Sequence, residues 1–307
     1  MIIFRNLTLS DKNIIDAYCA LLNRESCEYC FGNLYGWSKA YAYQFAFFGD
    51  ALCLSFKPED GATAYMMPLA EKDRDLQYAI RALYEGHRER GSQKAFSLLC
   101  LSPEDCKRLH RLYPDAFLLE NDRNEDEYMY EADSFRTYTG KALHGKRNHY
   151  NKFIQLYGTS SYEEITKANA EECLCMSEAW QRNNGENGHG TETEEEVIRT
   201  MLRSQEELAL SGGCLRINGQ IVAFTIGEPL AAYPDTVVIH VEKAQYDIPG
   251  AYPAIASLYL QHHPEFRYVN REEDMGLEGL RQSKLSYRPL RFVQKYHAVL
   301  TRPLGPV

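Results

Sequence analysis

Apolar positions in the first half of the chain follow helical spacing in some stretches and strand spacing in others. Ile14, Tyr18 and Leu21 belong to a stripe that predicts a helix over 11–30. The aromatic stretch 43–56 is broken by Gly49-Asp50, which is typical of a β-hairpin. The other elements expected in this half are a strand at 64–69, a helix at 73–90, a strand at 95–101, a helix at 103–112 and a strand at 128–132.

The second half repeats this order of elements. Alternating apolar residues flank Asn218-Gly219, the strongest hairpin signal in the chain. A polar stretch at 183–190 predicts a surface loop, since its glycines lack the spacing of a phosphate loop. The remaining elements expected are helices at 168–182 and 193–210, a strand at 236–241, a helix at 251–261, a strand at 266–270, a helix at 276–287 and a strand at 292–300.

This order predicts an α/β (α+β mixed-sheet) fold, and it resembles the layout of GNAT-type acyltransferases. Because one element order accounts for both halves, we expect two tandem duplicated GNAT-like domains. The predicted domains are residues 1–135 and 136–307, and a linker helix at about 140–157 begins the second domain.

Composition and charge exclude several classes of protein. The 307 residues carry a formal charge of -9, which disfavours indiscriminate binding to DNA or to anionic membranes. No apolar run reaches the roughly 18–20 residues of a membrane helix, and the N-terminus lacks the apolar core of a signal peptide. Nine cysteines, an odd number, favour reduced thiols, and Cys27-x-x-Cys30 lacks two further ligands at zinc spacing. We therefore expect a cytoplasmic protein without a metal ion or an integral membrane segment.

Two basic stretches, 134–162 and 280–307, contain no acidic residue. Helical projection places Arg281 and Lys284 within an apolar arc, and Arg147 within another. Buried cations need buried anions. Two interpretations stay open: structural ion pairs with nearby carboxylates, or a cleft for a phosphate-bearing substrate or a developing oxyanion.

Carboxylates gather where the strand predicted at 266–270 ends. Asp274 is placed to cap the following helix, which is the simpler interpretation of that residue. Glu272 has no such role. Together with His240 and Glu242 of the neighbouring predicted strand, it is expected to hold a substrate ammonium group or to act as a base.

Three segments resemble the family named for the C-terminal domain of phosphatidylglycerol lysyltransferase. They are the stretch from Asn270 to Pro289, the linker segment 143–153, and His240-Val-Glu-Lys243. The segments 33–37 and 126–130 are similar to it as well. The resemblance implies a tandem GNAT fold and transfer of lysyl or alanyl groups from charged tRNA to a phospholipid hydroxyl, without a nucleotide cofactor.

The resemblance also implies roles for individual residues. It implies contacts to phosphate or the acyl carbonyl from four cations, Arg147, Lys243, Arg281 and Lys284. It implies binding of the aminoacyl ammonium group by three carboxylates, Glu242, Glu272 and Asp274. The lipid-modifying members carry a membrane domain ahead of this module, which leaves two alternatives open for this chain: another acceptor, or loss of activity.

We therefore expect an aminoacyltransferase or acyltransferase that acts in the second half on aminoacyl-tRNA and a small or lipid acceptor. Lys284 or Arg281 would offset the oxyanion, Glu272 or His240 would move the proton, and Tyr287 is a candidate acid. Two alternatives stay open: a ligand- or protein-binding module without catalysis, and an N-acyltransferase with acyl-CoA as co-substrate. The CoA-dependent alternative is weaker, because 245–251 lacks the spacing of an acetyl-CoA loop.

Overall fold

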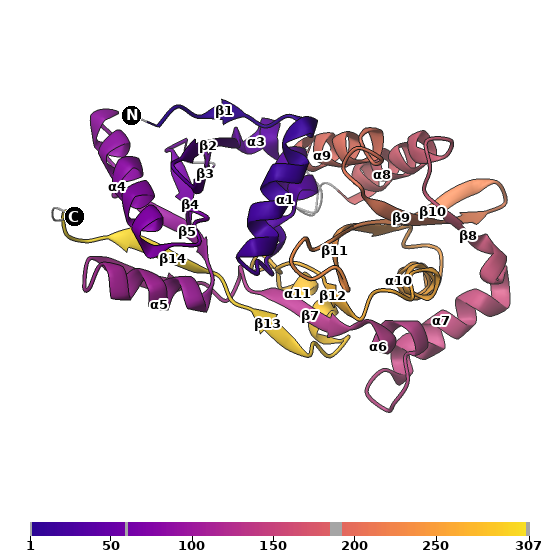
Figure 1. The fold of residues 1–307 in the computed structure, drawn as a ribbon. Helices are drawn as coiled ribbons and strands as arrows, with labels where there is room; N and C mark the ends of the chain where they lie inside the picture. The colour runs from indigo at the N-terminus through magenta and orange to yellow at the C-terminus, as the bar shows by residue number, and fades with distance from the viewer. Residues whose placement is uncertain (1, 59–60, 185–191, 305–307) are drawn as a thin grey trace. The chain divides into compact units, whose positions relative to one another are not determined.

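The computed structural model describes residues 2–58, 61–184 and 192–304. It divides the chain into two compact units, residues 1–127 with 293–307, and residues 128–292 (Figure 1). Each unit contains a seven-stranded mixed sheet, so the predicted mixed α/β class is confirmed. Most of the loop expected at 183–190 lies outside the described residues.

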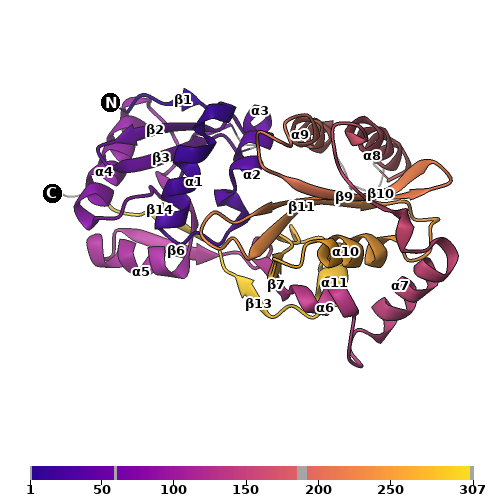
Figure 2. The ribbon, with the colours of Figure 1, turned by 45° about the vertical axis from the view of Figure 1, so that its right-hand side comes forward.

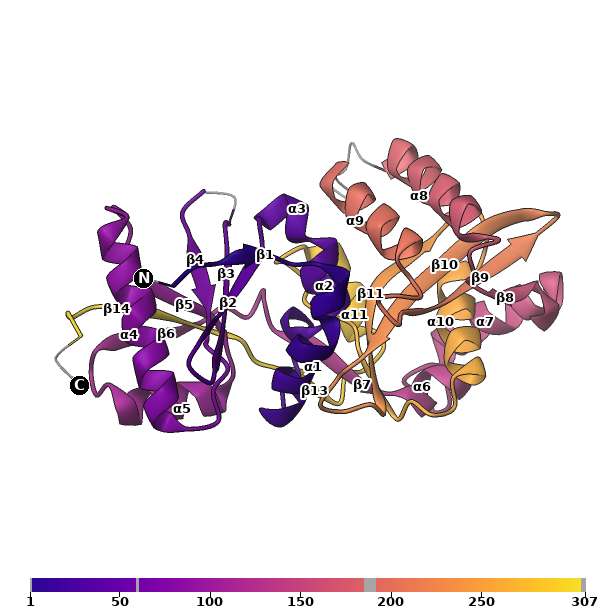
Figure 3. The same cartoon turned by 45° about the horizontal axis from the view of Figure 1, so that its top comes forward.

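The first unit has helices on both faces of its sheet (Figure 3). The strands, in order across the sheet, are β1 (Arg5–Asn6), β2 (Gln44–Phe48), β3 (Ala51–Phe56), β4 (Ala64–Met66), β5 (Ser97–Leu101), β14 (Tyr296–Leu300) and β6 (Phe117–Asn121). The helices are η1 (Leu9–Asp11), α1 (Lys12–Leu21), η2 (Cys27–Tyr29), α2 (Phe31–Gly36), α3 (Ser38–Tyr41), α4 (Asp73–Glu89) and α5 (Pro103–Leu112). The apolar stripe of α4 packs on this sheet and forms the core of the unit.

The second unit has α8 and α9 on one face of its sheet and α10 on the other (Figure 2). Its strands, in order, are β13 (Arg291–Val293), β7 (Glu127–Glu131), β12 (Tyr268–Asn270), β11 (Thr236–Ala244), β10 (Gln220–Pro229), β9 (Ser211–Ile217) and β8 (Tyr162–Glu164). Its helices are α6 (Ala132–Thr137), α7 (His144–Tyr157), η3 (Thr159–Ser161), α8 (Ala170–Asn184), α9 (Glu192–Arg203), α10 (Ala251–His262) and α11 (Glu278–Leu285). The core cluster joins the sheet to α6, α7 and α10.

Local signals account for most element boundaries. Asn218 and Gly219 both have positive φ, 50° and 81°, as the tight turn between β9 and β10 requires. Ser102 caps α5 and forms a capping box with Asp105. The helix expected over 11–30 ends earlier, at Leu21, because Asn23 adopts the left-handed conformation.

One strand of each sheet comes from the other half of the sequence. β14, near the C-terminus, pairs antiparallel with β5 and β6 of the first unit. β7, from the first half, pairs antiparallel with β12 of the second unit. The strand expected at 292–300 is thus divided between two sheets. The two compact units divide the chain after residue 127 and again after residue 292, whereas the sequence pattern predicts one boundary, between 135 and 136. Hydrophobic alternation indicates that a strand is buried, but it does not select the neighbouring strand.

Within the described residues, no helix is both long and apolar enough to cross a bilayer.

We predict that the exchanged strand β14 stabilises the first unit selectively. Ala298 is fully buried in β14, so Ala298→Glu places a charge in that core and should cost at least about 3 kcal/mol. Hydrogen exchange followed by mass spectrometry should show lost protection in β5 and β6 and retained protection in β9 and β10. Gln294→Glu, at an exposed position, is the matched control. Equal loss of protection in both units would contradict this prediction.

Candidate functional site

His240 occupies a β-bulge in β11. Ile226 of β10 pairs with Val241 and the next residue, Gly227, pairs with Ile239, so His240 is the extra residue. A Cβ atom on Gly227 would lie 2.7 Å from Cγ2 of Val237 and 2.9 Å from the hydroxyl of Tyr259. Only glycine fits there without a shift of these neighbours. The bulge therefore redirects one side chain at a closely packed point of the sheet.

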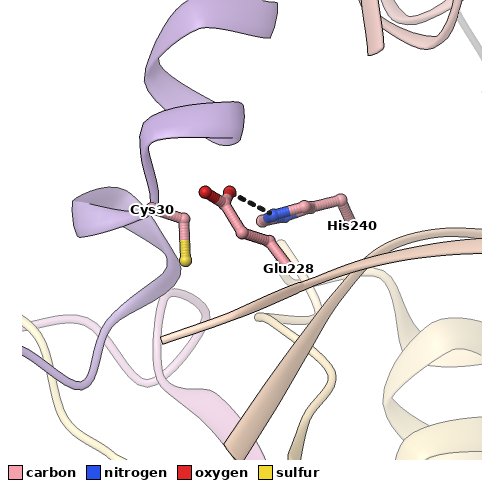
Figure 4. A group of neighbouring side chains, drawn as sticks. All are labelled: Cys30, Glu228 and His240. Carbon is pink, nitrogen blue, oxygen red and sulfur yellow. Dashed lines mark hydrogen bonds and ion pairs between the residues drawn. The ribbon is translucent and has the colours of Figure 1, made fainter. Parts of the chain in front are cut away.

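The His240 imidazole lies between two carboxylates. Its Nδ1 is 2.8 Å from Oε1 of Glu272, and its Nε2 is 3.3 Å from Oε2 of Glu228 (Figure 4 shows the latter contact). The side chains of His240 and Glu228 are each 2% exposed, whereas that of Glu272 is 23% exposed. Glu272 is therefore the more exposed of the two carboxylates.

Both ring nitrogens can donate to these carboxylates only when the imidazole is protonated. Burial alone would lower the pKa of His240, but the hydrogen bonds with Glu228 and Glu272 outweigh it and raise this pKa to about 9. At neutral pH His240 is thus a cation that donates two hydrogen bonds. Burial raises the pKa of Glu272, although the hydrogen bond from His240 opposes that effect.

A strained turn presents Glu272. The φ of Glu272 is +55°, its amide donates to Oδ1 of Asn270 at 2.9 Å, and its carbonyl accepts from the amide of Tyr128 at 3.1 Å. The buried ammonium group of Lys284 donates to the carbonyls of Arg271 and Glu273 on either side. Lys284, which the sequence placed against the substrate, holds the backbone of this turn in the structure.

Asp274 and Arg281 form an ion pair with each other. Arg281 donates from Nε at 2.9 Å and from Nη2 at 2.7 Å, and the hydroxyl of Tyr128 donates to the same carboxylate. Burial would raise the pKa of Asp274, but these hydrogen bonds hold it well below its usual range. The amide of Gly276 also donates to Asp274. This geometry fits the structural alternative that the sequence left open.

Arg271, Glu242, Tyr287 and Lys146 form a second group, which we call the Tyr287 cluster. Arg271 donates to Oε1 of Glu242 at 2.6 Å, and its guanidinium lies 4.9 Å from the Tyr287 ring centroid. Nζ of Lys146 lies 3.9 Å from the same centroid. Burial raises the pKa of Tyr287, so its phenol stays protonated at neutral pH. Glu242 therefore contacts Arg271, whereas the sequence grouped it with His240.

Lys243 and Arg147 lie in other surroundings. Lys243 points to α8 and α9, with Nζ 3.1 Å from Oε2 of Glu194 and 4.2 Å from the Trp180 ring centroid. Arg147 donates to the carbonyl of Tyr138 at 2.9 Å. Both contacts stabilise local structure.

Sequence reasoning missed Lys146, Arg271 and Glu228 as site residues. Lys146 lies three residues after Leu143, four before Tyr150 and seven before Phe153, so it shares one helix face with these apolar residues. Its spacing fits this apolar stripe more closely than that of Arg147 does. Glu228 is the one acidic residue of the otherwise mostly apolar strand β10. An isolated charge in an apolar strand is therefore the sequence signal that could have identified Glu228.

A divalent metal accepts ligands of the types found around His240. Here, however, both imidazole nitrogens face carboxylate oxygens, and a protonated imidazole has no lone pair for a metal. The hydrogen-bonded arrangement of this group therefore suits proton transfer or cation binding better than metal coordination.

The family of the phosphatidylglycerol lysyltransferase C-terminal region matches residues 19–299 of this chain. The chain belongs to this family. A solved structure of a conserved protein of unknown function from Bacteroides thetaiotaomicron VPI-5482 is 36% identical with a TM-score of 0.89, covering 98% of this chain and 100% of that one.

More distant structures share the fold. The C-terminal domain of a putative lysylphosphatidylglycerol synthetase from Agrobacterium fabrum is 13% identical with a TM-score of 0.65, over 95% of this chain and 92% of that one. A tandem GNAT protein from the clavulanic acid biosynthesis pathway is 10% identical with a TM-score of 0.50, over 99% and 100%. This family member therefore has the fold of tandem GNAT-like acyltransferases.

A curated relative, an uncharacterized protein of Mycoplasmoides gallisepticum, is 28% identical over 173 residues. The match covers 55% of this chain and 54% of that protein. This chain thus spans about half the length of the curated relative it matches.

We predict that His240 of this family member titrates with a midpoint near pH 9 in 15N NMR spectra. Because its folded pKa lies above the unfolded value of about 6.5, its contribution to stability is complete below about pH 6.5 and is lost as pH rises through about 9. Glu228→Gln removes one anionic partner and should lower the midpoint. Glu172→Gln, which changes a half-exposed carboxylate paired with Arg216, should not. A wild-type midpoint near 6.5 would contradict the double carboxylate contact.

We predict that Lys284→Met lowers the free energy of unfolding by about 2–4 kcal/mol, because the carbonyls of Arg271 and Glu273 lose their common donor. Urea denaturation measures this loss. Gln282→Met, on the exposed face of the same helix, should change stability by less than about 1 kcal/mol. Equal stability of the two variants would show that Lys284 does not support the turn.

Proposed function

We propose that the second unit transfers an aminoacyl group from an ester donor, such as aminoacyl-tRNA, to a hydroxyl or amine acceptor. The observation that carries this proposal is the buried imidazolium of His240 between Glu228 and Glu272. It lies in a chain of the phosphatidylglycerol lysyltransferase C-terminal family, whose name supplies the chemical class.

The charge of this group suits an aminoacyl substrate. When all three groups are ionised, two carboxylates and one imidazolium leave a net negative charge at the bulge of β11. An aminoacyl ester carries a free ammonium group, which a carboxylate binds through charge-assisted hydrogen bonds. Glu272 is the more exposed carboxylate, so we assign it to the substrate, and Glu228 to holding the other side of His240.

The same pair can move the protons of the reaction. The acceptor O–H or N–H attacks the ester carbonyl carbon, and the carbonyl electron pair moves onto oxygen. The oxyanion then collapses, and the bond to the donor oxygen breaks. Glu272 takes the proton of the acceptor, and protonated His240 gives a proton to the leaving oxygen. Transfer across the 2.8 Å contact between Glu272 and His240 restores both groups, so no proton is gained or lost overall.

The pKa of about 9 assigns these roles. A histidine protonated at neutral pH cannot be the base that accepts the first proton, but it can be the acid. Of the two proton-moving residues expected from the sequence, Glu272 thus takes the role of base and His240 that of acid.

The proposal is tested with aminoacyl-tRNA that is radiolabelled in its amino acid, mixed with total lipid and with soluble cell extract as acceptors. The wild-type protein should move label to one acceptor fraction. Glu272→Gln should reduce the rate by about 10²-fold or more, since it removes the base.

Two matched controls accompany this assay. Glu172→Gln changes an exposed carboxylate of the same unit, and His263→Gln changes a histidine that also faces two carboxylates, Glu164 and Glu265. Both should keep wild-type activity. Saturable binding of the labelled tRNA without any transfer would favour the non-catalytic binding module and contradict the proposal.

A further inference from the structure

Two cations converge on one aromatic ring in the Tyr287 cluster. Lys146 of α7 and Arg271, which follows β12, lie 3.9 and 4.9 Å from the Tyr287 ring centroid. The Phe135 ring stacks on the Tyr287 ring, with the two centroids 4.9 Å apart. Glu242 pairs with Nη2 of Arg271. One carboxylate thus accompanies two cations.

Both cations keep donors that are not used. Nη1 of Arg271 is buried and has no hydrogen-bond partner. Within the part of the chain that the structure describes, Lys146 forms no hydrogen bond or ion pair, and its Nζ lies over the Tyr287 ring. A buried donor without an acceptor is destabilising, so an acceptor placed at Nη1 of Arg271 would stabilise the site.

The charge balance shows which acceptor fits. Burial and the charge of Arg271 lower the pKa of Lys146 to about 8, and Glu242 offsets this only in part. Because the partner of Glu242 is Nη2, Nη1 of Arg271 and Nζ of Lys146 are the donors that remain for an acceptor. A neutral carbonyl would leave the excess positive charge in place, whereas an oxyanion would neutralise it.

We propose that Lys146 and Arg271 form a binding site for a phosphate group, with the Tyr287 ring as its floor. A tetrahedral phosphate offers several oxygens, enough to accept from both cations at once. As a subsite of the acceptor substrate, this assignment rests on the proposed function. The binding itself is independent of catalysis and is measured separately.

The test is competitive labelling of lysines in the full-length protein with trace acetic anhydride from pH 6 to 10, followed by mass spectrometry. Without ligand, Lys146 should react with a midpoint near pH 8. Inorganic phosphate at 10 mM should raise that midpoint by about one unit or more, equivalent to tenfold tighter binding to the protonated amine. Lys152, exposed on the same helix, is the internal control and should not respond.

Two probes separate the sources of the phosphate. Inorganic phosphate represents free phosphate and monoesters, and dimethyl phosphate represents the diester of a lipid headgroup. A response to dimethyl phosphate at equal or lower concentration assigns the site to a diester, and a response to inorganic phosphate alone assigns it to a monoester. No response to either probe at 20 mM would overturn the proposal.

Variants keep the test independent of folding. Lys146→Met should reduce phosphate affinity at least tenfold in calorimetry, whereas Lys152→Met should bind like the wild type. Arg271→Met leaves Glu242 buried without its partner, so the phosphate affinity of this variant is interpreted only if its thermal unfolding is normal. Equal affinity of Lys146→Met and the wild type would also overturn the site.

The transfer assay separates this proposal from the proposed function. Phosphate binding without any aminoacyl transfer would contradict the proposed function and leave the site intact. Transfer with an unchanged acceptor KM in Lys146→Met, together with no phosphate response, would contradict the site alone.

Discussion

A charged imidazole inside a sheet is the constraint on which the second unit depends. Removing His240 and Glu228 from water is costly unless every charge has a partner at good geometry. Several features supply that geometry at once. The bulge in β11 turns the imidazole, Gly227 leaves room for the neighbouring side chains, and the turn after β12 brings Glu272 to the other ring nitrogen. Lys284 then fixes the turn through two carbonyls.

The cations of the basic stretches, together with Arg271, divide into two groups by what they contact. Lys284, Arg281 and Arg147 satisfy backbone carbonyls or a buried carboxylate, and they hold loops and helices in place. Lys146 and Arg271 instead keep donors that no described residue accepts. The net charge of -9 therefore averages over a local excess of positive charge at Lys146 and Arg271 and a local excess of negative charge at Glu228 and Glu272. That pairing suits a substrate with both an ammonium and a phosphate group.

Local sequence signals predicted the elements well, and they predicted one part of the site. The Asn218-Gly219 turn and the Ser102 cap follow from backbone preferences, which act over a few residues. The contact between Glu272 and His240 was predictable because adjacent parallel strands bring their ends together. The pairing partner of each strand was not predictable, because the alternation of apolar residues is the same whichever neighbour a strand takes. β7 and β14 illustrate this, because each joins the sheet built mostly from the other half of the sequence. The β-bulge at His240 was not predictable either, since a bulge depends on the register between two strands. The contact of Glu228 with His240 depends on the bulge and was missed for the same reason.

The central claim is that protonated His240 gives a proton to the leaving oxygen during aminoacyl transfer. The pH profile of single-turnover transfer, corrected for spontaneous hydrolysis of the ester, tests it most directly. The account predicts a rate that falls as pH rises through about 9, the pKa of His240, and no such fall in the residual activity of His240→Gln. A wild-type rate that stays constant or rises from pH 8 to pH 10 would contradict the account.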